Sequence, residues 1–87
     1  MKELNLKRFL DGEGRLLVWP KKQTDKELVT AYLATKFQSD KSYTEREVNE
    51  VLKVWHVFND WAILRRELFE RGYLDRDRSG TDYRRLK

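Results

Sequence analysis

Hydrophobic side chains recur every three or four positions in three stretches of this chain, and that spacing predicts amphipathic helices. The stretches are Thr24 to Phe37, Thr44 to Phe58 and Asp60 to Arg71. None is long enough to be stable alone in water, so the apolar stripes must pack against one another. The pattern therefore predicts a core of three helices within residues 23–74.

The second of these helices has the clearest start signal. Thr44 is a good N-cap residue, and Glu47 three positions later completes a capping box. The apolar stripe that follows consists of Val48, Val51, Leu52 and Trp55. Thr24 and Glu27 have the same spacing, so they predict an equivalent capping box for the first helix.

The third helix has signals at both ends. Asp60 is expected to be its N-cap, and Gly72 can adopt the left-handed conformation that closes a helix, with Leu74 packing back on the last turn. Its apolar arc consists of Trp61, Leu64, Leu68 and Phe69. Arg65 falls within this arc. We therefore expect its stem to lie on the core and its guanidinium to pair with a carboxylate of a neighbouring element.

Shorter elements are predicted before the helices. Residues 4–10 favour a short helix that the loop 11–14 breaks. The apolar run 15–19, which Pro20 ends, favours a strand by its length and composition. Ser42 and Tyr43 favour a very short strand directly before the second core helix.

A β-hairpin is predicted for residues 74–87. A two-residue loop would place Asp77 opposite Asp82, and facing like charges destabilise a ladder. A three-residue loop instead gives Gly80 the left-handed position and pairs Arg76 with Asp82. We therefore expect the second register.

Helix, turn, helix and a basic two-stranded ribbon follow one another in a winged-helix domain. We expect an α+β winged helix-turn-helix with three core helices, a small antiparallel β-hairpin wing and an extra N-terminal helix and strand. Its parts are an N-terminal extension in residues 1–22, the helical core in 23–74 and the wing in 74–87. A chain of 87 residues is enough for one such domain.

The amino-acid composition limits the classes of function that the protein can have. Nineteen basic against 15 acidic residues give a net charge of +4, which permits a polyanionic partner without requiring one. The absence of cysteine excludes disulfides and thiolate chemistry and fits a reducing cytoplasm. No apolar run approaches the roughly 18 residues of a membrane span, and the N-terminus lacks the apolar segment of a signal peptide. A cytoplasmic location is therefore expected.

Catalytic motifs are absent from the sequence. It contains no phosphate loop, no nucleophile elbow and no cluster of metal ligands. His56, the single histidine, lies just off an apolar stripe without a partner at catalytic spacing. We therefore expect a non-enzyme without cofactor or metal.

DNA binding is the function that the fold favours. The third helix would enter the major groove, and the wing would meet phosphates or the minor groove. Candidate contacts are basic residues of that helix, of the wing and of the segment before the first core helix: Arg66, Arg71, Arg76, Arg78, Arg84, Lys21 and Lys22. Residues 60–78, however, carry five basic and five acidic residues, whereas phosphate binding favours a basic surplus.

The alternative is a winged-helix protein–protein interaction module that does not bind DNA. Ile63 on the outer face of the third helix and Trp19 beside Pro20 are candidates for a hydrophobic contact surface. Trp55 and Trp61 are assigned to the core. A homodimer formed through the N-terminal segment or the apolar run would be one form of this alternative.

Four stretches of the sequence form a specific combination: RFLDGEGRLLVWPKK, LATKF, YTEREVNEVLK and LRRELFERGYLDRDRSGTDY. Together they resemble the uncharacterised bacterial family "domain of unknown function 2087". The motif residues present here are Trp19, Pro20, Tyr43, Glu47, Asn49, Leu64, Arg65, Arg66, Leu68 and Gly72. The resemblance implies a winged-helix-like domain, which in that family occurs alone or at the C-terminal end of transcriptional regulators. It assigns none of these residues a biochemical role.

Overall fold

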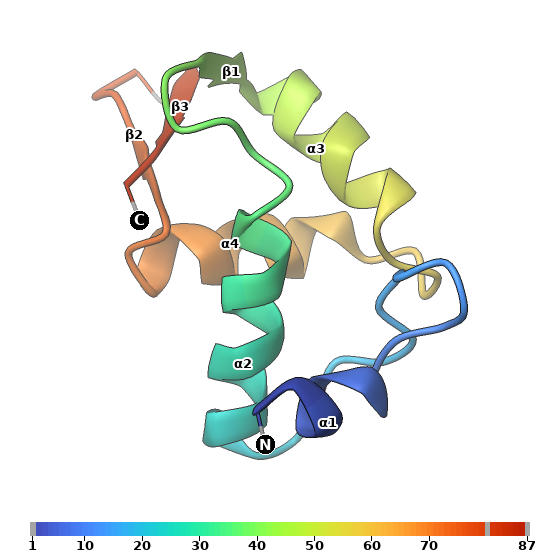
Figure 1. Ribbon diagram of the computed structural model, residues 1–87. Coiled ribbons are helices and arrows are strands. Elements are labelled where there is room, and N and C mark those ends of the chain that lie inside the picture. The colour runs from blue at the N-terminus through green and yellow to red at the C-terminus, as the bar shows by residue number, and fades with distance from the viewer. Residues whose placement is uncertain (1, 80, 87) are drawn as a thin grey trace.

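The computed structural model describes residues 2–79 and 81–86, with side chains from residue 5 onward. The described residues form four helices and a three-stranded antiparallel sheet, an α+β arrangement (Figure 1). The elements are α1 (Lys2–Lys7), α2 (Gln23–Ala34), β1 (Ser42–Thr44), α3 (Glu45–Val54), α4 (Trp61–Glu70), β2 (Leu74–Arg76) and β3 (Asp82–Arg85). The short strand expected at Ser42 and Tyr43 is thus present as part of β1.

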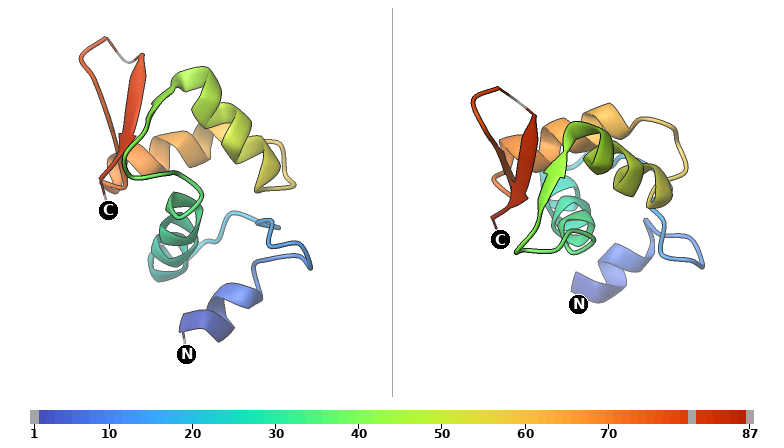
Figure 2. Two further views of the ribbon diagram at one scale, coloured as in Figure 1. Left: turned by 45° about the horizontal axis from the view of Figure 1, so that its top comes forward. Right: turned by 90° about the horizontal axis from the view of Figure 1, so that it is seen from above.

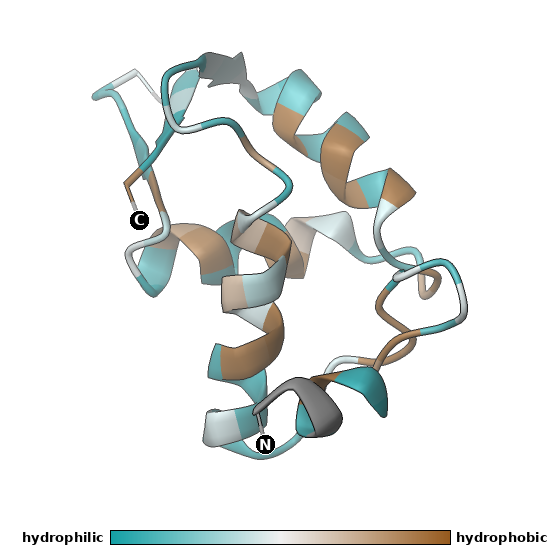
Figure 3. Cartoon of the chain, in the orientation of Figure 1, coloured by the Kyte–Doolittle hydropathy of each residue, from teal (hydrophilic) through white to brown (hydrophobic). Residues whose placement is uncertain are grey.

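Three helices and the sheet enclose one core. Figure 2 shows α2, α3 and α4 crossing one another, with the sheet at one end of the molecule and α1 at the other. Figure 3 shows the hydrophobic residues of α3 on the side turned toward α2 and α4. The buried core residues are Leu16, Val29, Leu33, Ala34, Phe37, Tyr43, Val48, Leu52, Leu64, Leu68, Leu74 and Tyr83.

The three tryptophans surround this core as half-buried side chains. The partly exposed position expected for Trp19 is confirmed, whereas the core positions expected for Trp55 and Trp61 are not found, because both are only partly buried. Each ring instead lies under a lysine ammonium, which is a cation–π arrangement. The pairs are Lys26 over Trp19 at 5.9 Å, Lys36 over Trp55 at 3.9 Å and Lys53 over Trp61 at 4.5 Å from the ring centroid.

The N-terminal caps of α3 and α4 are confirmed. The Glu47 N–H donates to Thr44 Oγ1 at 3.1 Å, and the Thr44 N–H donates to Glu47 Oε1 at 2.9 Å, which completes the capping box. The bond from the Thr44 N–H also lowers the pKa of Glu47, because it stabilises the ionised carboxylate. At α4, Asp60 accepts from the Ile63 N–H at 3.3 Å.

Gly72 closes α4 as expected, with φ at 80°. The Tyr73 N–H donates to the Leu68 carbonyl at 2.9 Å, and the Gly72 N–H donates to the Phe69 carbonyl at 3.1 Å. These two bonds form a Schellman motif. The residue two positions after the cap is therefore Tyr73 rather than Leu74, which is instead the buried first residue of β2.

The capping box predicted for the first core helix is wrong. The helix begins at Gln23, and its N-cap residue Lys22 makes no side-chain capping bond. The Glu27 carboxylate accepts from Arg71 and Tyr73, which belong to a distant part of the chain.

The strand predicted for residues 15–19 does not form. Leu16 alone makes isolated bridges, antiparallel to Leu10 and parallel to His56. Its N–H donates to the Trp55 carbonyl at 2.8 Å, and its carbonyl accepts from the Val57 N–H at 3.0 Å. The segment therefore forms β-type pairing only at Leu16, between the preceding loop and the α3–α4 turn, and does not form a continuous strand.

The His56 side chain stabilises the turn between α3 and α4. It is 5% exposed, and both ring nitrogens bond to backbone groups. Nε2 accepts from the Asp60 N–H at 2.9 Å, so the ring proton must lie on Nδ1, which donates to the Leu52 carbonyl at 2.5 Å. The ring thus joins the last turn of α3 to the N-cap of α4, and the single histidine has a packing role.

The hairpin has the register in which Asp77 lies opposite Asp82, which the sequence analysis rejected because the two charges are alike. The Cα partners are Leu74 with Arg85, Asp75 with Arg84 and Arg76 with Tyr83, and the Asp77 N–H donates to the Asp82 carbonyl at 3.0 Å. The predicted pairing of Arg76 with Asp82 is therefore wrong. The expected position of Gly80 lies outside the described residues.

The Asp77 carboxylate explains why this register is stable. It accepts from Ser79 Oγ at 2.9 Å, from the Thr81 N–H at 3.0 Å and from Thr81 Oγ1 at 3.1 Å. These bonds, led by the one from Ser79, lower the pKa of Asp77. The charge that would repel Asp82 is thus stabilised within the loop.

Two glycines in the loop before Leu16 give a matched pair for mutation. Gly14 has φ at 82°, its carbonyl accepts from the Tyr32 hydroxyl at 2.6 Å, and an added Cβ would lie 2.8 Å from that hydroxyl. Gly14→Ala should therefore lower the free energy of unfolding by about 1–3 kcal/mol. At Gly12 a Cβ meets nothing within 4 Å, so Gly12→Ala should stay within about 0.5 kcal/mol of the parent in urea titrations. Equal losses would contradict this account of the loop.

Candidate functional site

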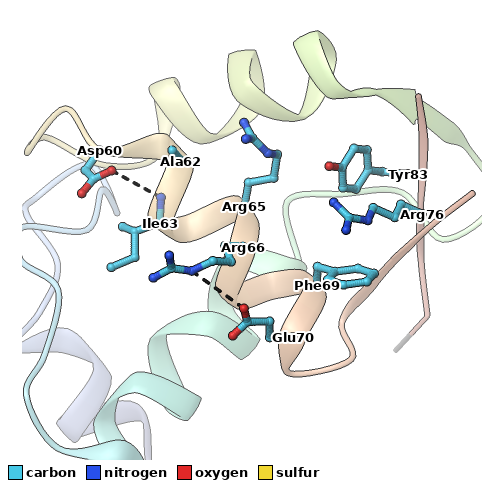
Figure 4. A pocket seen from close by; sticks show the side chains of 9 residues that line it. All are labelled: Asp60, Ala62, Ile63, Arg65, Arg66, Phe69, Glu70, Arg76 and Tyr83. Atoms are coloured by element: carbon cyan, nitrogen blue, oxygen red, sulfur yellow. Dashed lines mark hydrogen bonds and ion pairs between the residues drawn. The ribbon is translucent and has the colours of Figure 1, made fainter. Parts of the chain in front are cut away.

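A groove of about 620 Å³ lies between α4 and the hairpin (Figure 4). Residues of α4 form one wall, and residues of β2 and β3 form the other. The lining residues are Asp60, Ala62, Ile63, Arg65, Arg66, Phe69, Glu70, Arg76 and Tyr83. Three guanidinium groups thus share a surface with two aromatic rings and two carboxylates.

The helix presents its outer side to this groove. Ala62, Arg66 and Glu70 follow one another at helical spacing and are exposed, while Ile63 and Phe69 beside them are half-buried. The Arg66 side chain is 62% exposed and lies 3.9 Å from Glu70. An exposed ion pair at this distance is weak, so Arg66 remains available to an anionic partner.

The strand wall is set by the alternation of side chains along the sheet. Leu74 is buried, so Arg76 two residues later points to the same inner side, toward α4. Its guanidinium carbon lies 4.4 Å from the centroid of the Phe69 ring. Figure 4 shows Arg76 above Phe69 and next to Tyr83.

Arg65 has the surroundings that the sequence predicts. Its side chain is 23% exposed, its Nε lies 3.7 Å from Glu45, and its guanidinium donates to the Asn49 side chain. The Tyr83 hydroxyl donates to the same Glu45 carboxylate at 3.2 Å. Arg65 therefore links α4 to α3 at the back of the groove.

Arg71, another of the candidate contacts, does not line the groove. Its guanidinium donates to Glu67 at 2.8 Å, to Glu27 at 3.1 Å and to Gln23 at 2.8 Å. The bond to Glu67, followed by that to Glu27, raises the pKa of Arg71. This network connects α4 to α2, so the residue holds the helices together.

Tyr73 belongs to the same network. Its hydroxyl donates to the Glu27 carboxylate. Burial, together with this bond, raises the pKa of Tyr73 to about 12. The phenol therefore stays neutral at any pH at which the domain would work.

The basic residues of the hairpin do not form one surface. Arg84 lies across from Asp75 on the outer side of the sheet, where Asp82 is also exposed. Arg85 points inward and donates to the Phe37 carbonyl at 2.9 Å. Arg78 is exposed in the turn. Of the hairpin's candidates, the structure brings only Arg76 to the groove.

Lys21 and Lys22 are exposed at the start of α2, at the end of the molecule that carries α1 (Figure 1). They are therefore not brought together with the groove. Phe69 was assigned to the apolar arc, and its place under Arg76 was not foreseen. Its position one residue before the end of α4, seven positions before Arg76 in the sequence, is the signal that could have indicated this contact.

The family model described as "uncharacterized protein conserved in bacteria" (DUF2087) matches residues 15–85. The chain belongs to this family. The match includes Leu16, the whole of α4 and both strands that line the groove, so the site lies within the DUF2087 region. No curated protein and no solved structure matches the chain significantly.

The described residues contain neither a cluster of metal-ligand side chains nor a membrane-spanning helix. Among the side chains of residues 5–79 and 81–86, no three from His, Asp or Glu are grouped so that they could hold a metal ion. Among the helices of that part of the chain, none is long and apolar enough to cross a membrane.

Proposed function

We propose that this domain is a winged helix that binds duplex DNA through α4 and the hairpin. From α2 onward the elements follow the order helix, strand, two helices and hairpin, and the strands lie in the order β1-β3-β2. In this proposal α3 and α4 are the helix-turn-helix, α4 is the recognition helix and β2–β3 is the wing.

The groove between α4 and the hairpin carries the proposal. It has an arginine on each wall, Arg66 on the helix and Arg76 on the strand. A DNA backbone in this groove would be contacted from both sides, and the exposed Ala62 in the first turn of α4 would face the base edges.

The distribution of charged residues determines how tightly we expect the domain to bind DNA. Residues 42–87 carry ten basic and nine acidic side chains, so the surplus on this half of the chain is one. Neutralisation of two or three phosphates would give a slope of roughly −2 to −3 for log K against log salt. We therefore expect binding in the micromolar range at low salt and a steep loss at moderate salt.

Fluorescence anisotropy with a random duplex tests the proposal. Arg66→Gln should reduce the salt slope by about one. Lys22→Gln removes the same charge at the far end of the molecule and should leave the slope unchanged. A folded wild-type protein that does not bind the duplex at low salt would refute DNA binding by this domain.

A second candidate function is protein–protein interaction in the form of a homodimer. The exposed large hydrophobic side chains include Leu17, Val54 and Val57. Leu17 and Val57 directly follow the two residues of the parallel Leu16–His56 bridge, and in this proposal they contribute to one apolar surface. Sedimentation of the wild type and of Val57→Glu tests this function. A monomer at high concentration would refute it.

A further inference from the structure

The two sides of the sheet differ in charge. Since side chains alternate along a strand, Asp75, Asp82 and Arg84 lie on the outer side. Asp77 directly follows β2, and its carboxylate bonds to Ser79 and Thr81 in the turn. Among the described residues of the hairpin, the outer side and the adjoining turn residue Asp77 thus contribute three carboxylates, and the outer side contributes one guanidinium. A phosphate backbone placed there would meet a net negative surface.

Arg76 occupies the opposite, inner side. In the described part of the chain, Arg65 and Arg66 each lie within 4.0 Å of a carboxylate, but no such ion pair involves Arg76. Its guanidinium instead rests on the Phe69 ring at 4.4 Å. Among the arginines that line the groove, Arg76 is therefore the one whose charge is not offset by a neighbouring acid.

We infer that Arg76 is the phosphate contact of the wing and that Phe69 positions it, so that the DNA backbone runs between α4 and the hairpin rather than over the hairpin's turn or outer side. This inference rests on the proposed function. It specifies which of the hairpin's exposed arginines, Arg76, Arg78 or Arg84, contacts the duplex.

Phe69 contributes by restricting the guanidinium. A planar guanidinium on an aromatic ring samples fewer orientations than a free one, so less freedom is lost when it binds a phosphate. Loss of the ring should weaken DNA binding only while Arg76 is present. A double-mutant cycle between the two residues measures this dependence.

Anisotropy titrations of three charge-matched variants test the assignment. Arg76→Gln should weaken binding to a random duplex on the order of tenfold and reduce the salt slope by about one, as expected for one lost charge-assisted phosphate bond. Arg78→Gln and Arg84→Gln remove the same charge and should each change the affinity less than about twofold. If either weakens binding as much as Arg76→Gln, the inference is wrong while DNA binding stands.

Phe69→Leu tests the positioning role. It should weaken binding several-fold in the wild type and not at all in the Arg76→Gln background, whereas Phe69→Tyr, which keeps the ring, should bind as the wild type does. An equal loss in both backgrounds would refute positioning. Thermal melting shows whether Phe69→Leu folds. If it does not, DNA binding by Phe69→Trp and Phe69→Tyr decides the question. Binding as tight as that of the wild type supports the role of the ring, and weakened binding by both variants overturns it. A folded wild type without DNA binding would remove the proposed function itself.

Discussion

Replacement of Leu16 by alanine is expected to lower the free energy of unfolding by about 2–5 kcal/mol. The side chain is 0% exposed, although it belongs to a loop outside the three core helices. Its backbone is held by Trp55 and Val57, so the chain cannot collapse around the space that a smaller side chain would leave. For a domain of this size the melting temperature should fall on the order of 10–30 °C.

Leu17 is the matched control, because it is the same residue type at the next position and is 43% exposed. Leu17→Ala should cost less than about 1 kcal/mol. Urea titration of the two variants and the parent measures the difference. A Leu16→Ala protein as stable as the parent would mean that the N-terminal extension is not part of the core.

His56→Ala is expected to cost roughly 2–5 kcal/mol, because it leaves the Asp60 N–H and the Leu52 carbonyl without their side-chain partner. The two groups are not equivalent. The Leu52 carbonyl also accepts from the Trp55 N–H at 3.1 Å, whereas no other bond from the Asp60 N–H is found in the described residues. Most of the loss should therefore come from the Asp60 N–H at the start of α4.

Two polar variants separate these contributions. The Gln side chain can place an oxygen near the position of Nε2 and accept from Asp60, while the Asn side chain can place an amide near Nδ1 and donate to Leu52. His56→Gln should therefore be more stable than His56→Asn in urea titrations. The reverse order would show that the bond to the Leu52 carbonyl is the important one.

Motifs whose partners are close in sequence were predictable. The capping box of Thr44 and Glu47 and the Gly72 termination of α4 involve residues within five positions of each other, and both form. Thr24 and Glu27 have the spacing of the first motif but do not form it. The Glu27 carboxylate instead accepts a hydrogen bond from Arg71, 44 positions away. A pattern of neighbouring residues cannot predict a bond to so distant a partner.

The predictions for the hairpin register and for a strand at residues 15–19 were wrong for a similar reason. The rule against facing like charges considers Asp77 and Asp82 alone, but the bonds from Ser79 and Thr81 stabilise the Asp77 carboxylate. The composition of residues 15–19 favours a strand, yet strand formation needs a neighbouring edge. The fold offers Leu16 only one bridge on each side.

The site was predictable to the extent that helical periodicity defines it. Position in the apolar arc was enough to predict that Arg65 would find a carboxylate on a neighbouring element. The same periodicity placed Arg71 on the outer face, but its bonds to Glu27 and Gln23 depend on how α2 crosses α4, which the sequence does not reveal. The aromatic partner of Arg76 likewise depends on how the hairpin folds back on α4.

The bridge between Leu16 and His56 also bears on the order of folding, since it joins segments 40 positions apart. By contrast, α3 and α4 are separated by a turn of six residues and pack directly on each other. Closure of a long loop costs entropy before its contacts are made, so we expect the two helices to associate early and the Leu16 clamp to form late. Loss of the Leu16 side chain should then accelerate unfolding and leave the refolding rate nearly unchanged.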